Sequence, residues 1–316
     1  MFNKITCNPK LSVLVTAHGF EKYLKQCLDS IVSQKVNFCY EILCCDDCSP
    51  DSSPLILEDY QKRYPTLIKI IKNDRNLHYP KTNAKLISQA AGDYFIHIDG
   101  DDYLTNENKL QTQVDFLEKN KKFSGVGHNT MLVFEDGKKN EPMINLKIDA
   151  THTALDIISG KTYFHTSSMM YRNIFRKNIP DFFTHPYAGD WLFMIVYAEH
   201  GNIGYIDELM SVYRIHKGGI WTSLGDLKQI ERNIDFCPYY NKFLGYRYNL
   251  NFLLRTKMFI EHLRKNFETE LKNNKKLNRK ICRISLTCRM VKKLSEYGFK
   301  ITWGTTLMKN QKHLKI

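Results

Sequence analysis

The sequence predicts an α/β protein with a mainly parallel mixed sheet, followed by a basic helical region. Through the first 120 residues, short apolar runs rich in β-branched residues alternate with longer amphipathic stretches, the pattern of βαβ units. Several of these runs end at a polar residue, namely Thr16, Asp46 and Asp99. Beyond Ser223 the periodicity becomes helical and basic residues accumulate. These observations separate a sheet-based first part from a helical last part.

The expected elements follow in order along the chain. Apolar runs predict strands over 11–16, 41–45, 67–71 and 94–98, and amphipathic spacing predicts helices over 23–34, 54–64 and 82–91. In an open α/β sheet, ligands bind outside the carboxyl ends of the strands. The segments that follow these strands should therefore converge on one pocket: Thr16-Ala17-His18, Asp46-Asp47 and Asp99 to Asp102.

The segment Asp99-Gly100-Asp101-Asp102 gathers carboxylates directly after a predicted strand. Mg2+ and Mn2+ take oxygen ligands, and they are usually held by one or two carboxylates together with substrate phosphates. The segment therefore predicts a divalent metal that bridges to a phosphorylated substrate. A polar turn is the plain alternative, since Asp and Gly are favoured in turns.

The charge is distributed unevenly along the chain. Residues 226–316 hold 21 Lys and Arg against 7 Asp and Glu, whereas residues 1–225 hold 25 against 26. The net charge of +13 therefore belongs to the last third, which is expected to face a membrane surface, a nucleic acid or an acidic glycan. A solvated helical surface is the alternative.

The ends and the cysteines indicate a cytoplasmic protein. The segment 1–10 has no apolar core of signal-peptide length, and the longest strongly apolar stretch, 191–198, is too short to span a membrane. Nine scattered cysteines do not form the pattern of a disulfide framework in a chain of this size, so reduced thiols are expected.

Four segments, taken in order, resemble the successive motifs of the family 2 glycosyltransferases, which have the Rossmann-like GT-A fold. They are Leu11-Ser-Val-Leu-Val-Thr-Ala-His18, Glu41-Ile-Leu-Cys-Cys-Asp-Asp-Cys-Ser-Pro-Asp51, Gly92-Asp-Tyr-Phe-Ile-His-Ile-Asp-Gly-Asp-Asp102 and Gly189-Asp-Trp-Leu-Phe193. The segment Val212-Tyr-Arg-Ile-His216 is similar to a late motif of the same family. The resemblance covers roughly residues 11–223.

The resemblance implies a role for each motif. Thr16, Ala17 and His18 would contact the nucleotide, and Asp47 would pair with its base, commonly uracil. Asp99 would lie nearest the ribose. The metal, Mn2+ or Mg2+, would be bound by Asp101 or Asp102, with His216 reaching the metal or the diphosphate.

Asp190 would be the base that takes the proton from the acceptor hydroxyl, although an Asp before an apolar helix is also a common N-cap. Two departures from the family pattern are visible. Lys81-Thr82-Asn83 replaces the usual Ala-Arg-Asn, so either Lys81 or Lys85 supplies the positive charge or the helix only packs and makes no donor contact. His18 stands where another residue is usual, which favours a contact through its backbone.

The expected function is a metal-dependent inverting transfer of a hexosyl or N-acetylhexosaminyl group. The donor expected is a nucleotide sugar linked to UDP, and the acceptor is a saccharide or lipid-linked glycan in cell-surface polysaccharide or lipooligosaccharide synthesis. Residues 1–225 would form the catalytic domain and 226–316 a basic, mainly helical region. A sugar nucleotidyltransferase, a phosphohydrolase and a non-catalytic basic module that binds nucleic acid are the alternatives. The first lacks its Gly-rich phosphate loop here and the second its early Asp-x-Asp, and no nucleic-acid partner is expected.

The basic region is expected to place the enzyme peripherally on the inner face of the cytoplasmic membrane, on anionic lipid. Residues 279–299 carry an apolar stripe flanked by cations, the composition of an interfacial helix. Cations expected to face the lipid are Lys275, Lys276, Arg279, Lys280, Arg283, Arg289, Lys292 and Lys293, and side chains expected to enter the headgroups are Ile284, Val291 and Leu294.

Overall fold

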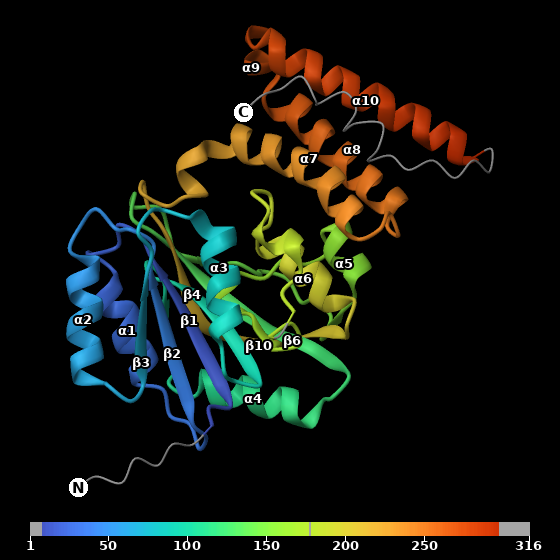
Figure 1. The fold of residues 1–316 in the computed structure, drawn as a ribbon. Coiled ribbons are helices and arrows are strands. Elements are labelled where there is room, and N and C mark those ends of the chain that lie inside the picture. The colour runs from blue at the N-terminus through green and yellow to red at the C-terminus, as the bar shows by residue number, and fades with distance from the viewer. Residues whose placement is uncertain (1–7, 177, 297–316) are drawn as a thin grey trace, which may run out of the picture. The chain divides into compact units, whose positions relative to one another are not determined.

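The computed structural model describes residues 8–176 and 178–296 (Figure 1). These residues form two compact units. The first holds the described residues up to Ala154 together with Thr162–Ile215, and the second holds Leu155–Lys161 together with the described residues from His216 onward. The boundary expected between residues 225 and 226 lies directly after Gly225, the first residue of α7 (Gly225–Phe243). In the structure the second unit resumes earlier, at His216.

The first unit is built on a mixed sheet with the strand order β3-β2-β1-β4-β9-β6-β10-β5 (Figure 1). Its parallel part holds the four predicted strands, and β6 and β10 form a second parallel pair, which confirms the predicted fold class. The short strand β9 runs antiparallel between β4 and β6. The strands are β1 (Leu11–Ala17), β2 (Tyr40–Asp46), β3 (Ile68–Lys72), β4 (Tyr94–Asp99), β5 (Tyr103–Leu104), β6 (Phe123–Phe134), β7 (Glu141–Pro142), β8 (Thr151–His152), β9 (Met170–Arg172) and β10 (Asn202–Ile215).

Helices cover both faces of this sheet because neighbouring residues of a strand point to opposite sides. Val13, Val15 and Ile98 share one buried cluster with apolar residues of α1 (Leu24–Val32), α2 (Ser53–Arg63) and α4 (Lys109–Lys119). On the opposite face, Phe95 packs on α6 (Asp190–Ala198) and His97 bonds to α3 (His78–Gln89). The polar side chains of the site lie on this second face.

Helix α3 begins at His78, four residues before the predicted start at residue 82. Pro80 lies in its first turn, where proline is tolerated because the backbone N–H groups there have no partner within the helix. His78 itself has a positive φ of 64°. The helix therefore includes this proline in its first turn and is longer at its start than predicted.

The second unit is helical, as predicted for the chain beyond residue 223. It contains α7 (Gly225–Phe243), α8 (Asn249–Asn266), α9 (Glu268–Asn273) and α10 (Lys275–Glu296), together with most of α5 (Ala154–Ser159). The inclusion of α5 has a local cause, since the guanidinium of Arg255 on α8 donates to the carbonyl of Ser159, 3.4 Å away. Short 3-10 turns complete the chain at Thr166–Ser168, Asp181–Thr184 and Thr222–Leu224.

The apolar stripe of α10 is part of the protein core. Ile281 is 0% exposed and Ile284 5% exposed. Lys280 lies against α7, with its Nζ 2.9 Å from Glu231 Oε1 and 2.8 Å from Asp235 Oδ2. The predictions that Ile284 enters a headgroup layer and that Lys280 faces lipid are therefore wrong. Periodicity identifies an apolar face but not what covers it. The side chains of Lys292, Val291 and Leu294, also expected at the membrane, lie outside the described residues.

Within the described residues, no helix is both long and apolar enough to cross a membrane. Free thiols are present at Cys27, Cys44, Cys45, Cys48, Cys237, Cys282 and Cys288. Cys39 is disulfide-bonded, so the expectation of reduced thiols is wrong at that position.

Candidate active site

The ends of β1, β2 and β4 lie side by side. Thr16 is in register with Asp99, and Ala17 with Asp46. Asp47 follows directly, and its N–H donates to the Ala17 carbonyl, 2.9 Å away. The structure therefore brings together the three strand-end segments that the sequence placed in one pocket. We call these segments, Thr16 to His18, Asp46 with Asp47, and Asp99 to Asp102, the strand-end edge.

Asp47 is a buried carboxylate held in a fixed orientation. Its Oδ1 accepts from Asn73 Nδ2 and from the backbone N–H of Leu77, both at 2.8 Å. Asn73 is held in turn by Thr82 and by Lys85, whose Nζ lies 2.6 Å from Asn73 Oδ1. Of the two lysines considered as replacements for the missing arginine, Lys85 is therefore the one tied to the surroundings of Asp47.

The His18 side chain is held by protein partners. Its Nδ1 lies 2.9 Å from the Asp47 carbonyl oxygen, and its Nε2 lies 3.0 Å from Asn76 Nδ2. Both ring nitrogens are thus engaged. This arrangement agrees with the expectation that His18 would meet a nucleotide through its backbone, and that contact stays a prediction.

Asp99 lies in a hydrogen-bonded group on β1, β4 and α3. Thr16 Oγ1 donates to Asp99 Oδ1 at 2.8 Å, and His97 Nε2 is 3.3 Å from the same oxygen. The other ring nitrogen of His97 lies 2.8 Å from Asn83 Oδ1, and the ring stacks on Tyr79. Burial alone would raise the pKa of Asp99, but the hydrogen bonds from His97 and Thr16 outweigh it and leave this pKa below its usual value. Asp99 is therefore kept ionised.

Asp101 and Asp102 have different surroundings. Asp102 is 1% exposed, and its Oδ1 accepts from the Arg214 backbone N–H at 3.0 Å. The backbone carbonyl of Asp101 accepts from Arg214 Nε at 2.9 Å. Gly100 keeps the turn tight, because a Cβ there would lie 2.8 Å from the Thr16 carbonyl oxygen. The cluster is thus fastened to β1 on one side and to β10 on the other.

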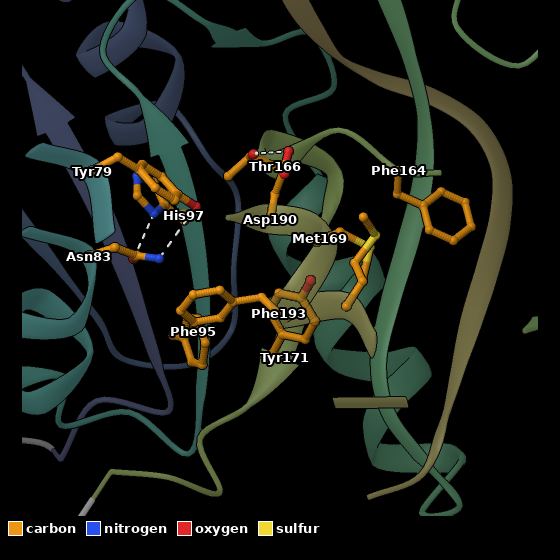
Figure 2. Close-up of a pocket in the computed structure, with 11 residues that line it drawn as sticks. Tyr79, Asn83, Phe95, His97, Phe164, Thr166, Met169, Tyr171, Asp190 and Phe193 are labelled. Atoms are coloured by element: carbon orange, nitrogen blue, oxygen red, sulfur yellow. Dashed lines mark hydrogen bonds between the residues drawn. The ribbon is translucent and has the colours of Figure 1, made fainter. Parts of the chain in front are cut away.

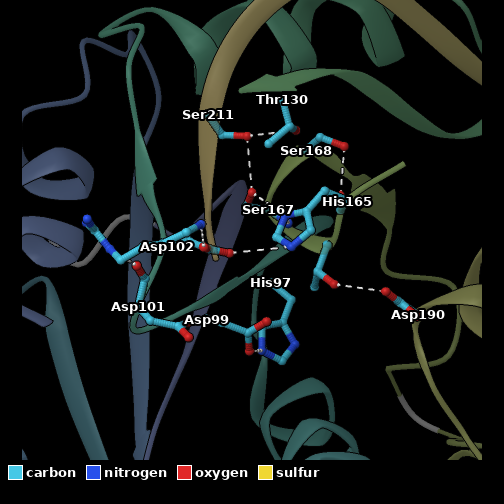
Figure 3. Close-up of polar contacts among 12 residues, drawn as sticks. His97, Asp99, Asp101, Asp102, Thr130, His165, Ser167, Ser168, Asp190 and Ser211 are labelled. Atoms are coloured by element: carbon cyan, nitrogen blue, oxygen red, sulfur yellow. Dashed lines mark hydrogen bonds and ion pairs between the residues drawn. The ribbon is translucent and has the colours of Figure 1, made fainter. Parts of the chain in front are cut away.

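A buried polar network lies behind Asp102 (Figure 3). His165 Nε2 is 3.6 Å from Asp102 Oδ2, an oxygen that accepts no hydrogen bond from the described residues. Burial lowers the pKa of His165 to about 4, and burial together with the charges of Asp101 and Asp99 raises the pKa of Asp102 well above its usual value. The His165 ring is held by Ser167, 2.8 Å from its Nδ1, and by stacking on Tyr213.

Asp190 is the first residue of α6, and its two oxygens have separate partners. Oδ1 accepts from the Trp191 N–H at 2.8 Å. Oδ2 accepts from the Tyr163 hydroxyl and from Thr166 Oγ1, and Figure 2 shows the Thr166 contact. Burial raises the pKa of Asp190, and the hydrogen bond from Tyr163 acts against this rise. A carboxylate with a raised pKa suits proton transfer near neutral pH. Gly189 is the N-cap of α6, with Asp190 as the first helical residue, so the N-cap interpretation of Asp190 is wrong, although its Oδ1 does accept the free N–H of Trp191.

A small cavity separates Asp190 from the group around Asp99 (Figure 2). Its volume of ≈ 20 Å³ is about the room that one water molecule needs. The residues that line it include Asn83, His97, Thr166 and Asp190, and its remaining wall is mostly aromatic and sulfur-containing. The candidate base Asp190 and His97, the partner of Asp99, therefore line the same cavity.

The donor set fits a hard divalent cation. Carboxylates stand at three of the four positions from Asp99 to Asp102, and Asp102 Oδ2 is a buried oxygen without a hydrogen bond. Among the described residues, no three His, Cys, Asp or Glu side chains are arranged to hold a metal by themselves. Mg2+ and Mn2+ usually complete such sites with water and substrate phosphates. His216 opens the second unit, where its carbonyl accepts from Thr222 Oγ1, and its role as a ligand stays a prediction.

Several residues of the site were not identified from the sequence. They share the property of holding a predicted residue in place, and they are Asn73, Asn83, His97, Tyr163, His165 and Thr166. One of them carried a signal, because a histidine in the apolar run of β4 must find polar partners when it is buried. The others come from loops and helices whose neighbours depend on the tertiary fold.

Comparison with known proteins gives relatives over part of the chain. The protein "Uncharacterized protein Mb1547" of Mycobacterium bovis is 29% identical over 215 residues, which are 67% of this chain and 61% of the relative. The match thus covers less than two thirds of that relative's length. The poly(ribitol-phosphate) beta-glucosyltransferase of Bacillus spizizenii is 36% identical over 105 residues, 32% of this chain and 16% of the relative.

Solved structures share the fold. TarS of S. aureus in complex with UDP-GlcNAc has a TM-score of 0.56 at 20% identity, over 80% of this chain and 81% of that one. The mannosyltransferase PcManGT of Pyrobaculum calidifontis, in complex with GDP-Man and Mn2+, has a TM-score of 0.55 at 14% identity, over 83% of this chain and 76% of that one. The sequence model for glycosyl transferase family 2 matches residues 12–179, more than half of the chain. This chain therefore belongs to glycosyl transferase family 2.

Proposed function

We propose that this protein is a metal-dependent inverting glycosyltransferase that moves a sugar from a nucleotide donor to a glycan acceptor. The observation that carries the proposal is that Asp190 lines the same small cavity as His97, whose ring nitrogen Nε2 lies 3.3 Å from the Asp99 carboxylate. An enzyme of this type needs a base for the acceptor and a charged site for the leaving diphosphate, and the two are separate here.

The donor is proposed to be a UDP-sugar, with Asp47 meeting the base and Asp99 the ribose. Asp47 is held by Asn73 and Leu77 through Oδ1 alone, which leaves its second oxygen for the base. TarS was solved with UDP-GlcNAc and supports uridine, whereas PcManGT was solved with GDP-Man, so guanosine donors belong in the test.

Asp101 is proposed as the main metal ligand with Asp102 Oδ2 as the second oxygen, since Asp102 Oδ1 already accepts from the Arg214 backbone. When bound, Mn2+ or Mg2+ would stabilise the charge that develops on the diphosphate. Asp190 accepts the proton of the acceptor hydroxyl while that oxygen attacks the anomeric carbon from the side opposite the diphosphate. His97 and Thr16 keep Asp99 ionised and oriented throughout.

The acceptor is proposed to be a saccharide or lipid-linked glycan of the cell surface. The match to a beta-glucosyltransferase named for poly(ribitol-phosphate) supports a cell-surface polymer. The excess of positive charge in residues 226–316 supports a peripheral position on the anionic inner face of the cytoplasmic membrane.

The test is a panel of UDP-, GDP- and dTDP-sugars with Mn2+ or Mg2+, in which nucleoside diphosphate release is followed with and without acceptor pools. We expect release from one donor that stops in EDTA and falls at least about 100-fold in Asp101→Asn. Asp207→Asn, at an exposed aspartate of β10, is the matched control and should behave as wild type. Pyrophosphate as the released product would instead identify a nucleotidyltransferase, and binding without turnover would identify a non-catalytic module.

A further inference from the structure

The side of α10 that faces away from the core carries exposed apolar residues. Leu286 is 59% exposed and Met290 56% exposed, one helical turn apart. The buried residues of this helix, Leu277, Ile281, Ile284 and Cys288, follow a four-three-four spacing. Leu286 and Met290 belong to a second row with the same spacing on the opposite side of the helix.

Cations surround this apolar pair. Arg279 and Arg283 precede it in the same row, Lys293 follows it, and Arg289 lies beside it, and all four are exposed. Among the described residues, none of the four is in an ion pair, and α10 has no acidic residue before Glu296. We call these six residues the outer face of α10: Arg279, Arg283, Leu286, Arg289, Met290 and Lys293.

We propose that the outer face of α10 binds an anionic lipid bilayer, with Leu286 and Met290 entering the headgroup region. The proposal rests on the proposed function for its purpose, which is to bring the enzyme to a lipid-linked acceptor. It places the lipid on the side of the helix opposite to the stripe of Ile281 and Ile284, which the protein itself covers.

The chemistry of the outer face favours lipid over other partners. Arginine and lysine can keep their charges at phosphate level while long aliphatic chains reach further in, which is the usual arrangement of an interfacial helix. A nucleic acid would use the four cations but has no need of Leu286 and Met290. A second copy that met this face with its own would oppose cation to cation.

The experiment measures sedimentation of the full chain with vesicles of phosphatidylcholine alone or mixed with phosphatidylglycerol. Wild type should bind only the mixed vesicles, and less as salt is raised. Arg279→Gln with Arg283→Gln should weaken the partition coefficient about fivefold for each charge removed. Leu286→Ser with Met290→Ser should weaken it at least about tenfold.

The matched control is Leu250→Ser with Met258→Ser on α8, at residues 49% and 52% exposed. This variant should bind vesicles as wild type does. Unchanged partition of the outer-face variants, equal binding to neutral vesicles, concentration-dependent dimers abolished by Leu286→Ser, or binding to RNA that outcompetes vesicles would each overturn the proposal.

The vesicle assay needs no sugar donor, so it stands whether or not the proposed function is correct. Conversely, the outer-face variants should release nucleoside diphosphate from soluble donor at the wild-type rate, because their residues take no part in the site. Loss of vesicle binding with unchanged donor turnover supports the membrane role alone.

Discussion

The surroundings of the strand-end edge and of the apolar stripe of α10 were both predicted from residue patterns. The first prediction is confirmed, and the second is wrong. At the strand-end edge, parallel pairing of β1, β2 and β4 places Thr16, Asp46 and Asp99 in adjacent positions, as the pattern required. On α10 the predicted apolar stripe is present, but it is covered by protein, because α10 contacts α7 and α8. A strand end has few possible neighbours, whereas a helix face can be covered by protein or by lipid.

The largest expected effect concerns Asp190, the base proposed to act beside the strand-end edge. Asp190→Asn keeps the size of the side chain and removes the base, so kcat should fall about 10²- to 10⁴-fold. The dissociation constant of the donor, measured by calorimetry, should change little, because the partners of Asp190 are Tyr163, Thr166 and the Trp191 backbone. An equal loss of donor affinity would make Asp190 a binding residue.

The next prediction contrasts the two sides of α10. Ile284→Ala should cost about 2–5 kcal/mol of unfolding free energy, since it empties a buried position. Leu286→Ala, two residues away and 59% exposed, should change stability by less than about 0.5 kcal/mol. Urea titration of both variants measures the difference. Equal values would mean that the two faces are not distinct.

A smaller effect is expected at Tyr163. Its hydroxyl donates to Asp190, whose pKa is raised by burial and lowered by this hydrogen bond. Tyr163→Phe therefore raises the pKa of Asp190 further, while the nearby charge of Asp99 and the Thr166 hydroxyl are unchanged. The acid limb of the kcat/KM profile should move up by about one pH unit, with activity lost at low pH and recovered at high pH. A uniform loss at every pH would contradict this role.

The smallest effect concerns Lys280, a half-buried cation between two carboxylates. Lys280→Met should lower stability near neutral pH by about 1 kcal/mol, because Asp235 then loses the cation beside it and Glu231 is left with its ion pair to Lys228. Burial raises the pKa of Glu231, but Lys228 and Lys280 outweigh this effect and leave the pKa below its usual value. The stabilisation that the ionised Glu231 provides is therefore complete at pH values above its pKa in the unfolded chain, and it is lost as pH falls through its pKa in the folded protein. Denaturation at neutral and acid pH should show the gap between variant and wild type closing in acid.

The fold class and the strand-end edge could be predicted because each depends on local pattern and on strand order. Thr16, Asp47 and Asp99 follow strands whose apolar runs are evident in the sequence. Residues such as Tyr163 and His165 could not be predicted, since they come from a segment without periodic pattern and meet Asp190 and Asp102 only after folding. The same limit applies to Lys280, whose partners lie 45 and 49 positions earlier.

The position of Asp47 affects how variants at this residue must be read. Its carboxylate accepts from the Leu77 N–H, at the start of α3, a helix whose own N-cap side chain makes no hydrogen bond. Asp47 thus serves as the cap of a helix that begins 31 residues further along the chain. Replacing it with alanine would loosen the first turn of α3 and remove any contact with a base at the same time. Weaker nucleotide binding in such a variant would therefore be ambiguous, and only a melting curve recorded without nucleotide could separate a lost cap from a lost contact.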